Sequence, residues 1–217
     1  MSKLLASIKE AIEKCELRDG MTISFHHHMR NGDYVLNMVL DEIAKMGIKD
    51  LTVNASSVFD VHEPIIGHVK NGVVTGIECN YMGGKVGKAI SEGIMDKPVI
   101  FRSHGGRASD MEKGTSVIDV AFIAAPTADD MGNCTGKVGK SACGSIGYAF
   151  ADAMNAKKVV VITDNLVEYP LVDFSIPEVY VDYVVAVDQI GNPAGIVSGT
   201  TKITRDPVGL KMASYAA

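Results

Sequence analysis

The chain has 217 residues, 47% apolar and 22% charged, a balance typical of a soluble globular protein. Its formal net charge of −5 argues against a nucleic-acid partner, because binding a phosphate backbone needs a basic face. No apolar run is long enough to span a bilayer, and the charged first residues differ from a signal peptide, so a cytoplasmic protein without a membrane partner is expected. Cys15, Cys79, Cys134 and Cys143 have no paired spacing, which predicts reduced thiols in or near the core.

The first third of the chain has the pattern of a β-α-β unit. A helix is expected first, because its apolar residues recur at helical spacing: Leu5, Ile8, Ile12 and Cys15. A strand, a second helix and another strand follow, at Met21–Phe25, 33–47 and Leu51–Val53. Asp33 can cap the second helix, and Gly47 can end it in the left-handed conformation.

Strands and helices continue to alternate along the rest of the chain. Further strands are predicted at Val73–Ile77, Pro98–Phe101, Ile118–Ala124, Val159–Ile162 and Tyr183–Val187. Further helices are predicted at Gly84–Gly93, Ser141–Met154 and Asp206–Ala217. Several strands lack polar alternation, as expected when helices cover both faces of a parallel sheet. The sequence therefore predicts one α/β domain over residues 1–217, a three-layer α/β/α, doubly wound, mostly parallel sheet of about seven strands.

A run of potential hydrogen-bond donors follows the first long strand, where α/β sheets gather ligand-binding groups. It consists of His26, His27, His28, Arg30, Asn31 and Gly32. An expression tag is disfavoured, because the run is internal and short. A metal site is possible, but successive residues of an extended segment point to opposite sides, and no acidic or thiolate third ligand is near. The favoured interpretation is a substrate loop whose imidazoles and arginine bind carboxylates or an oxyanion.

A second donor-rich segment, Arg102–Arg107, follows the strand that ends at Phe101. We expect it at the same edge of the sheet as the histidines, where its arginines would suit carboxylate or phosphate binding. A solvated loop fits this segment equally well. Further along, Asp129–Asn133 has oxygen ligands for a divalent ion, but a polar turn is the preferred interpretation.

Three glycine clusters approach known motifs without meeting them. Met82–Gly87 lacks the first glycine of a dinucleotide fingerprint, and Gly83–Lys88 lacks the length and hydroxyl residue of a P-loop. Gly139–Cys143 has a cysteine where a nucleophile elbow needs its second glycine. Tight turns are therefore expected. Anion binding by such turns where they open helices stays possible.

Four segments resemble the citrate lyase alpha chain family: 19–33, Ile43–Thr52, Ser103–Arg107 and Ile196–Thr201. The His-His-His-x-Arg run is the most specific of them, and the resemblance covers essentially the whole chain. It implies a CoA-transferase-like fold and a transferase. That enzyme exchanges acetyl for citrate on an acyl-carrier-protein thioester, releasing acetate and forming the citryl thioester.

The resemblance also suggests roles for individual residues. The substrate would be bound by His26, His27, His28, Arg30, Asn31 and Gly32. A facing loop for a CoA phosphate or a carboxylate would comprise Gly83, Gly84, His104, Gly105, Gly106 and Arg107. Family members carry two halves in one chain, and this sequence resembles the first. No nucleophile is therefore assigned, because CoA-transferases place their catalytic glutamate in the second half.

The resemblance further implies partners. These would be the second half of the transferase, the citrate lyase beta chain and the gamma chain that acts as acyl carrier. No cofactor is expected to be bound covalently to this chain, and no metal. The thioester would sit on the carrier's dephospho-CoA-derived group, or on CoA. An oligomer is expected, because a half-enzyme should expose an apolar face. Two alternatives stay open: a non-catalytic domain that binds an acyl-CoA-like ligand or scaffolds assembly, and a metal-dependent hydrolase.

Overall fold

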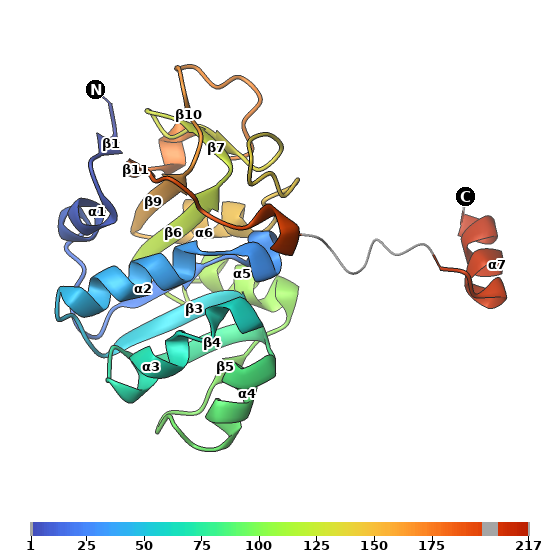
Figure 1. The fold of residues 1–217 in the computed structure, drawn as a ribbon, viewed down its shortest axis with the longest axis horizontal. Helices are drawn as coiled ribbons and strands as arrows, with labels where there is room; N and C mark the ends of the chain where they lie inside the picture. Colours follow the sequence, from blue (N-terminus) through green and yellow to red (C-terminus); the bar gives the residue numbers. More distant parts are fainter. Residues whose placement is uncertain (1, 197–203, 217) are drawn as a thin grey trace.

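A computed structural model of the protein describes residues 2–196 and 204–216. Its centre is an eight-stranded sheet in which all neighbouring strands are parallel (Figure 1). In spatial order the strands are β1 (Leu4–Leu5), β11 (Tyr183–Ala186), β9 (Lys158–Thr163), β6 (Val120–Ala125), β2 (Thr22–Phe25), β3 (Leu51–Val58), β4 (Val74–Met82) and β5 (Ile100–Phe101). A second, three-stranded sheet contains β10 (Leu166–Val167), β7 (Thr127–Asp129) and β8 (Cys134–Thr135).

Helices cover both faces of the large sheet. The α-helices are α1 (Ile8–Lys14), α2 (Val35–Lys45), α3 (Ile65–Lys70), α4 (Gly84–Ser91), α5 (His104–Glu112), α6 (Ala149–Asn155) and α7 (Pro207–Ala216). Short 3-10 helices are η1 (His27–Gly32), η2 (Asp60–His62), η3 (Glu178–Tyr180) and η4 (Pro193–Gly195). In Figure 1, α2 and α3 lie in front of the strands and α5 and α6 behind them. No residue of α7 is buried.

Two apolar cores confirm the predicted three layers. Strand side chains alternate between faces, so Phe122 of β6 packs in the core of α1 to α4, and its neighbour Ile123 packs in the core of α5 and α6. Val160 and Val161 of β9 divide in the same way. Burial on both faces explains why these strands read as continuous apolar runs.

The chain winds outward from the middle of the sheet in two directions. It first runs from β2 through β3 and β4 to β5, then returns to place β6 beside β2 and continues through β9 to β11. Ile23 of β2 therefore pairs with Val53 on one side and Val120 on the other. The boundary between β2 and β6 is the topological switch point of this doubly wound sheet. Ligands of such folds bind at the carboxyl ends of the strands there.

Several predicted boundaries were wrong for local reasons. The helix expected over Ser141–Met154 is the shorter α6, because Gly144 and Gly147 adopt φ angles of +84° and +55° that interrupt a right-handed helix. Leu5 belongs to β1 rather than to the first helix. Strands of two or three residues, such as β1 and those of the small sheet, are too short to show periodicity.

Other local expectations were confirmed. The Asp33 carboxylate accepts from the Val35 backbone N–H at 3.0 Å, and Gly47 ends α2 with φ +78°. All four cysteines are free thiols, three of them buried. Among the described residues, no helix is both long and apolar enough to cross a membrane. Residues 197–201, the larger part of the Ile196–Thr201 segment, lie outside the described residues.

Candidate active site

The histidine run lies at the switch point. It leaves the carboxyl end of β2 and forms η1, a 3-10 turn rather than the extended segment that the sequence suggested. The turn gathers the three imidazoles. The ring of His26 stacks on that of His27 with 5.0 Å between centroids and on that of His28 with 5.3 Å. The expected alternation of side chains is therefore wrong.

His28 is bound entirely to the protein. Its Nε2 lies 2.7 Å from the Ala124 carbonyl oxygen at the end of β6, and its Nδ1 lies 3.2 Å from Nδ1 of His26. A carbonyl can only accept a hydrogen bond, so Nε2 of His28 carries the hydrogen. Both ring nitrogens of His28 are engaged by protein groups, so His28 orients His26. The sequence predicted that His28 would bind substrate, but these contacts leave neither of its ring nitrogens for a ligand.

The three histidines are neutral at neutral pH. Burial lowers the pKa of His26 well below its usual range, and the nearby imidazoles and Arg107 lower it further. Burial, followed by the effect of His104, lowers the pKa of His27 to about 4. Burial also lowers the pKa of His28, although the Ala124 carbonyl opposes this. The positive charge expected from the histidine run is thus supplied by Arg30 alone.

His27 brings the two predicted donor segments together. Its backbone N–H donates to Ser56 Oγ at 2.9 Å, and its Nδ1 forms a short contact with the same oxygen. Its ring meets that of His104 edge to face, with centroids 5.0 Å apart. The turn after β2 and the segment after β5 therefore share one edge of the sheet, as their strand positions predicted.

Arg30 has a strained backbone. Its φ and ψ of 53° and −136° lie outside the regions open to side-chain-bearing residues. Such strain is kept when the surroundings enforce it, and it concentrates at functional sites. The surroundings here include η4, because an added Cβ at Gly32 would come within 2.6 Å of Ile196 Cγ1. Gly32 is thus needed for close packing, and the structure places it against the chain rather than toward open space.

The segment around Arg107 is not the flexible loop that its glycines suggested. Ser103 caps α5 by accepting from the Gly106 backbone N–H at 3.0 Å, so His104, Gly105 and Gly106 form the first helical turn. Arg107 points inward and is 2% exposed. Its guanidinium donates to both Asp152 oxygens, at 2.6 and 2.9 Å, and to Asn54. These contacts bury Arg107, whereas the sequence predicted that it would face a ligand.

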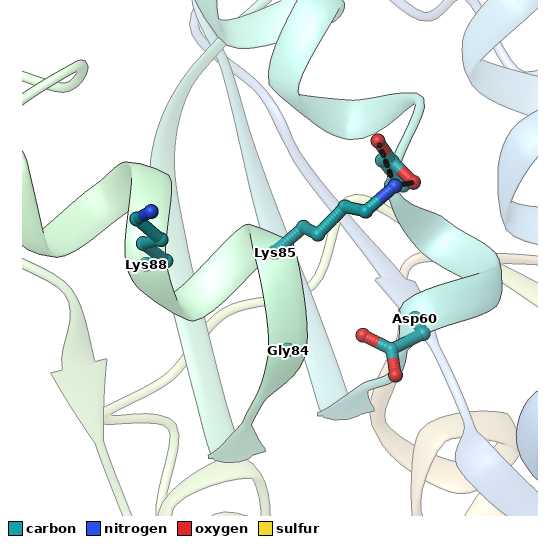
Figure 2. Close-up of a pocket in the computed structure, with 5 residues that line it drawn as sticks. Asp60, Gly84, Lys85 and Lys88 are labelled. Atoms are coloured by element: carbon teal, nitrogen blue, oxygen red, sulfur yellow. Dashed lines mark hydrogen bonds and ion pairs between the residues drawn. The ribbon is translucent and has the colours of Figure 1, made fainter.

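Two cavities adjoin the glycines at the start of α4. One of about 200 Å³ is lined by Asn31, Phe59, Asp60, Tyr81, Gly83 and Gly84. It brings Asn31 of the histidine turn against Gly83 and Gly84 of the second predicted loop. The larger one, about 450 Å³, is lined by Asp60, Glu63, Gly84, Lys85 and Lys88 (Figure 2).

The larger cavity has mixed charge. Lys85 Nζ contacts Glu63 at 2.9 Å, and a Cβ at Gly84 would overlap the Asp60 carboxylate. Figure 2 shows Asp60 beside Gly84, where the start of α4 favours a negative group. An acidic side chain of the protein thus already stands where a bound anion would be favoured. Asp60 and Gly84 line the smaller cavity as well, so the smaller cavity is the better candidate for a ligand carboxylate or phosphate only because Asn31 of the histidine turn also lines it.

Sequence reasoning missed the contribution of β3 and the residues after it. Ser56, Asn54 and Phe59 support the histidines and Arg107, but the strand was expected to end at Val53. The one available signal was the polar run that follows Val53, unusual for a buried strand. Asp129 forms the polar turn that was preferred, since Oδ1 accepts from three backbone N–H groups. Within the described ranges, no three His, Cys, Asp or Glu side chains are grouped to bind a metal.

Comparison with known proteins gives consistent relatives. A family model described as citrate lyase, alpha subunit, matches residues 1–217. The citrate lyase alpha chain of Haemophilus influenzae is 47% identical over 99% of this chain and 43% of its own length. A structure of the citrate lyase alpha subunit from Streptococcus mutans in complex with citrate has a TM-score of 0.92 and 59% identity, covering 100% of this chain and 42% of that one.

More distant structures show the fold. An acyl-CoA transferase from Escherichia coli O157:H7 has a TM-score of 0.66 at 13% identity, covering 94% of this chain and 50% of that chain. The predicted CoA-transferase-like architecture is therefore confirmed. The chain spans less than half the length of the citrate lyase relatives that it matches.

Proposed function

Because the chain belongs to the citrate lyase alpha-subunit family, we propose that it supplies the substrate-binding part of a transferase that exchanges acetyl for citrate on an acyl-carrier-protein thioester. The observation that carries this proposal is the position of the histidine turn. It places Arg30 and His27 at the switch point of the sheet, beside a cavity lined by Asn31. The 59% identical relative, described as a complex with citrate, supports a tricarboxylate as the ligand.

The proposed exchange makes simple chemical demands. A free carboxylate and an acetyl thioester become a new thioester and free acetate, with no net gain or loss of a proton. The site must therefore hold carboxylates and stabilise negative charge on the thioester oxygen. Arg30 provides the fixed charge, and neutral His27 provides a ring that can hydrogen bond without competing for protons at neutral pH.

The other site residues have complementary proposed roles. Asn31, Gly83 and Gly84 line the smaller cavity, where backbone N–H groups would meet a carboxylate or a phosphate. His104 stands across from His27 at the same edge. The thioester would be presented by the dephospho-CoA-derived group of an acyl carrier protein, or by CoA, and not by a group attached to this chain.

The proposed partners follow from the relatives' greater length. The second half of the transferase, together with the beta and gamma chains of citrate lyase, would complete the enzyme. The edge strand β5 is a suitable contact, since Ile100 and Phe101 are 46% and 60% exposed and no described strand pairs with its outer side. Assembly would cover this apolar edge, and an oligomer is expected.

Arg30→Ala tests the substrate assignment. Hydrogen bonds to charged groups contribute about 1.5–3 kcal/mol, so citrate affinity should fall roughly 10- to 100-fold by calorimetry. The rate of acetyl-citryl exchange should fall as well in the chain assembled with the second half. Arg18→Ala, at an exposed arginine that precedes the start of β2, whereas η1 follows its end, is the matched control. Equal citrate affinity in the two variants would refute the role of Arg30.

The alternative function is a non-catalytic domain that binds an acyl-CoA-like ligand or scaffolds assembly. It is favoured because this chain spans less than half the length of its relatives. Assays of thioester exchange by the chain alone, and by the chain with the second half, separate the two functions. Exchange by the chain alone would refute the alternative, and no exchange in either assay would refute the transferase.

A further inference from the structure

One ring nitrogen of the histidine turn has no protein partner. His26 is 9% exposed, its Nε2 is fully buried, and no group within residues 2–196 and 204–216 forms a hydrogen bond with that atom. A buried polar atom left in this way destabilises the fold by about 1–3 kcal/mol, so native proteins rarely retain one without a function. The nitrogen lies in the turn that we propose binds substrate.

The hydrogen-bond chain fixes which form of His26 is present. His28 must donate from Nε2 to the Ala124 carbonyl, so its neutral ring has a lone pair on Nδ1. The Nδ1 of His26, 3.2 Å away, must then carry the hydrogen that bridges the two rings. A neutral imidazole has a single N–H, and the Nε2 of His26 is therefore a hydrogen-bond acceptor. The backbone of β6 sets this tautomer through His28.

The surroundings restrict what can donate to this acceptor. Burial and the nearby Arg107 guanidinium both disfavour positive charge at His26, so a cationic donor is unsuited to the position. The adjoining Cε1 atom faces Gly147, where an added Cβ would lie 3.6 Å away. A residue without a side chain therefore adjoins this edge of the ring. A small, neutral donor such as a hydroxyl matches the charge of these surroundings.

Citrate carries one neutral donor, the hydroxyl on its central carbon. We propose that Nε2 of His26 accepts the hydrogen bond of this hydroxyl and that His26 thereby selects a hydroxylated tricarboxylate over one without the hydroxyl. The inference rests on the proposed function, since it takes citrate as the substrate. The hydroxyl keeps its proton, because the acyl exchange needs no net proton transfer. His28 is a positioning residue that holds the acceptor nitrogen toward the ligand.

Nuclear magnetic resonance tests the tautomer without any variant. Long-range ¹H–¹⁵N spectra distinguish protonated from unprotonated ring nitrogens, and His26 should show hydrogen on Nδ1 and a lone pair on Nε2 at pH 7. His28→Phe removes the acceptor that orients His26 and should return His26 toward the common Nε2–H form. A hydrogen on Nε2 of His26 in the unsubstituted chain would overturn the proposal.

Calorimetry with two ligands tests the selectivity. Citrate should bind the chain, assembled with its second half, at least about tenfold more tightly than propane-1,2,3-tricarboxylate, because the analogue leaves the acceptor unpaired. In His26→Phe this ratio should fall to near one through weaker citrate binding. In His26→Gln, whose amide oxygen can occupy the position of Nε2, part of the preference should return.

The possible outcomes distinguish the role of His26 from the proposed function of the chain. Equal affinities for the two ligands in the unsubstituted protein, or a ratio that His26→Phe leaves unchanged, would overturn the role of His26 while the proposed function stands. Such a result would mean that a buried water satisfies the nitrogen. Failure of citrate to bind at all would overturn both. Circular dichroism of each variant shows whether the fold is kept, and the tautomer measurement decides the case if His26→Phe fails to fold.

Discussion

Arg30 and Arg107 each follow histidine in a segment that comes after a parallel strand, but only Arg107 is buried. Arg107 meets Asp152 and Asn54, which satisfy its guanidinium. The side chain of Arg30 forms no hydrogen bond or ion pair with the described residues, and its backbone is strained. Arg107 thus stabilises the fold, whereas the side chain of Arg30 stays available for a ligand. The two arginines differ because Asp152, which is distant in the sequence, binds the guanidinium of Arg107.

The largest expected effect of this contrast is on stability. Arg107→Ala leaves the Asp152 carboxylate buried and unpaired, which should reduce the free energy of unfolding by about 3–5 kcal/mol. Arg30→Ala should change it by less than about 0.5 kcal/mol, as at ordinary surface positions. Urea denaturation of both variants measures the difference. A double variant, Arg107→Met with Asp152→Leu, should be more stable than Arg107→Ala, and equal losses from Arg30→Ala and Arg107→Ala would contradict the contrast.

Acidification should weaken the histidine turn next. The folded-state pKa of His27 is about 4 against 6.5 for the ordinary group, and burial lowers those of His26 and His28 too. The unfolded chain therefore takes up protons first as the pH falls. Stability present above pH 6.5 should be lost between pH 6.5 and 4, by up to about 1.4 kcal/mol per pH unit for each histidine.

Urea midpoints measured at fixed pH values across this window test the linkage. His27→Gln is the control, because it removes one of the three titrating groups. It should reduce the slope of the free energy of unfolding against pH by the equivalent of up to one proton. An identical slope in His27→Gln would show that His27 is not held neutral. His68→Gln, at a histidine in α3 outside the turn, should leave the contribution of the turn in place.

A smaller effect should follow from crowding the turn. An added methyl group in Gly32→Ala would lie 2.5 Å from the Asn192 carbonyl oxygen and 3.0 Å from the Ile196 nitrogen, both backbone atoms that cannot turn aside. We expect a loss of about 1–3 kcal/mol in urea denaturation. Gly67→Ala in α3, which meets nothing within 4 Å, should instead gain about 0.5–1 kcal/mol. If Gly32→Ala leaves the free energy of unfolding unchanged, η4 does not pack closely against the turn.

The smallest effect should come from releasing the strain. Arg30→Gly accepts the φ of 53° without a clash, and Arg30→Ala does not, so the glycine variant should be more stable by about 1 kcal/mol. Both variants should bind citrate equally weakly, because both lack the guanidinium. If Arg30→Ala is as stable as Arg30→Gly, the backbone of the turn carries no strain.

Most of the fold could be predicted from the sequence because its signals are local. The apolar runs that became β6 and β9, and the stripe of α2, are short-range patterns that tertiary contacts strengthen. Local signals also misled. Gly105 and Gly106 resembled a loop, yet the Ser103 cap and the buried Arg107 made them a helical turn.

The candidate site was predictable in place but not in chemistry. A donor run after a parallel strand indicates the correct edge of the sheet. The protonation of the histidines depends on burial and on contacts such as that between His28 and Ala124, which are 96 residues apart. The partner of Arg107 lies 45 residues away in α6. No periodicity or motif contains that information, because the chain's own path around the sheet creates it.

The contact between Gly32 and Ile196 has a consequence for whatever follows in the chain. Ile196 is anchored against the histidine turn, and the next described residue, Thr204, is joined to it by eight peptide links. Those links reach at most about 28 Å, so Thr204 is tethered within that radius of Ile196, and each later residue can lie at most one further link away. Such a tether keeps a segment at an effective concentration on the order of millimolar. Even a weak contact made there would thus engage the turn as an intramolecular event.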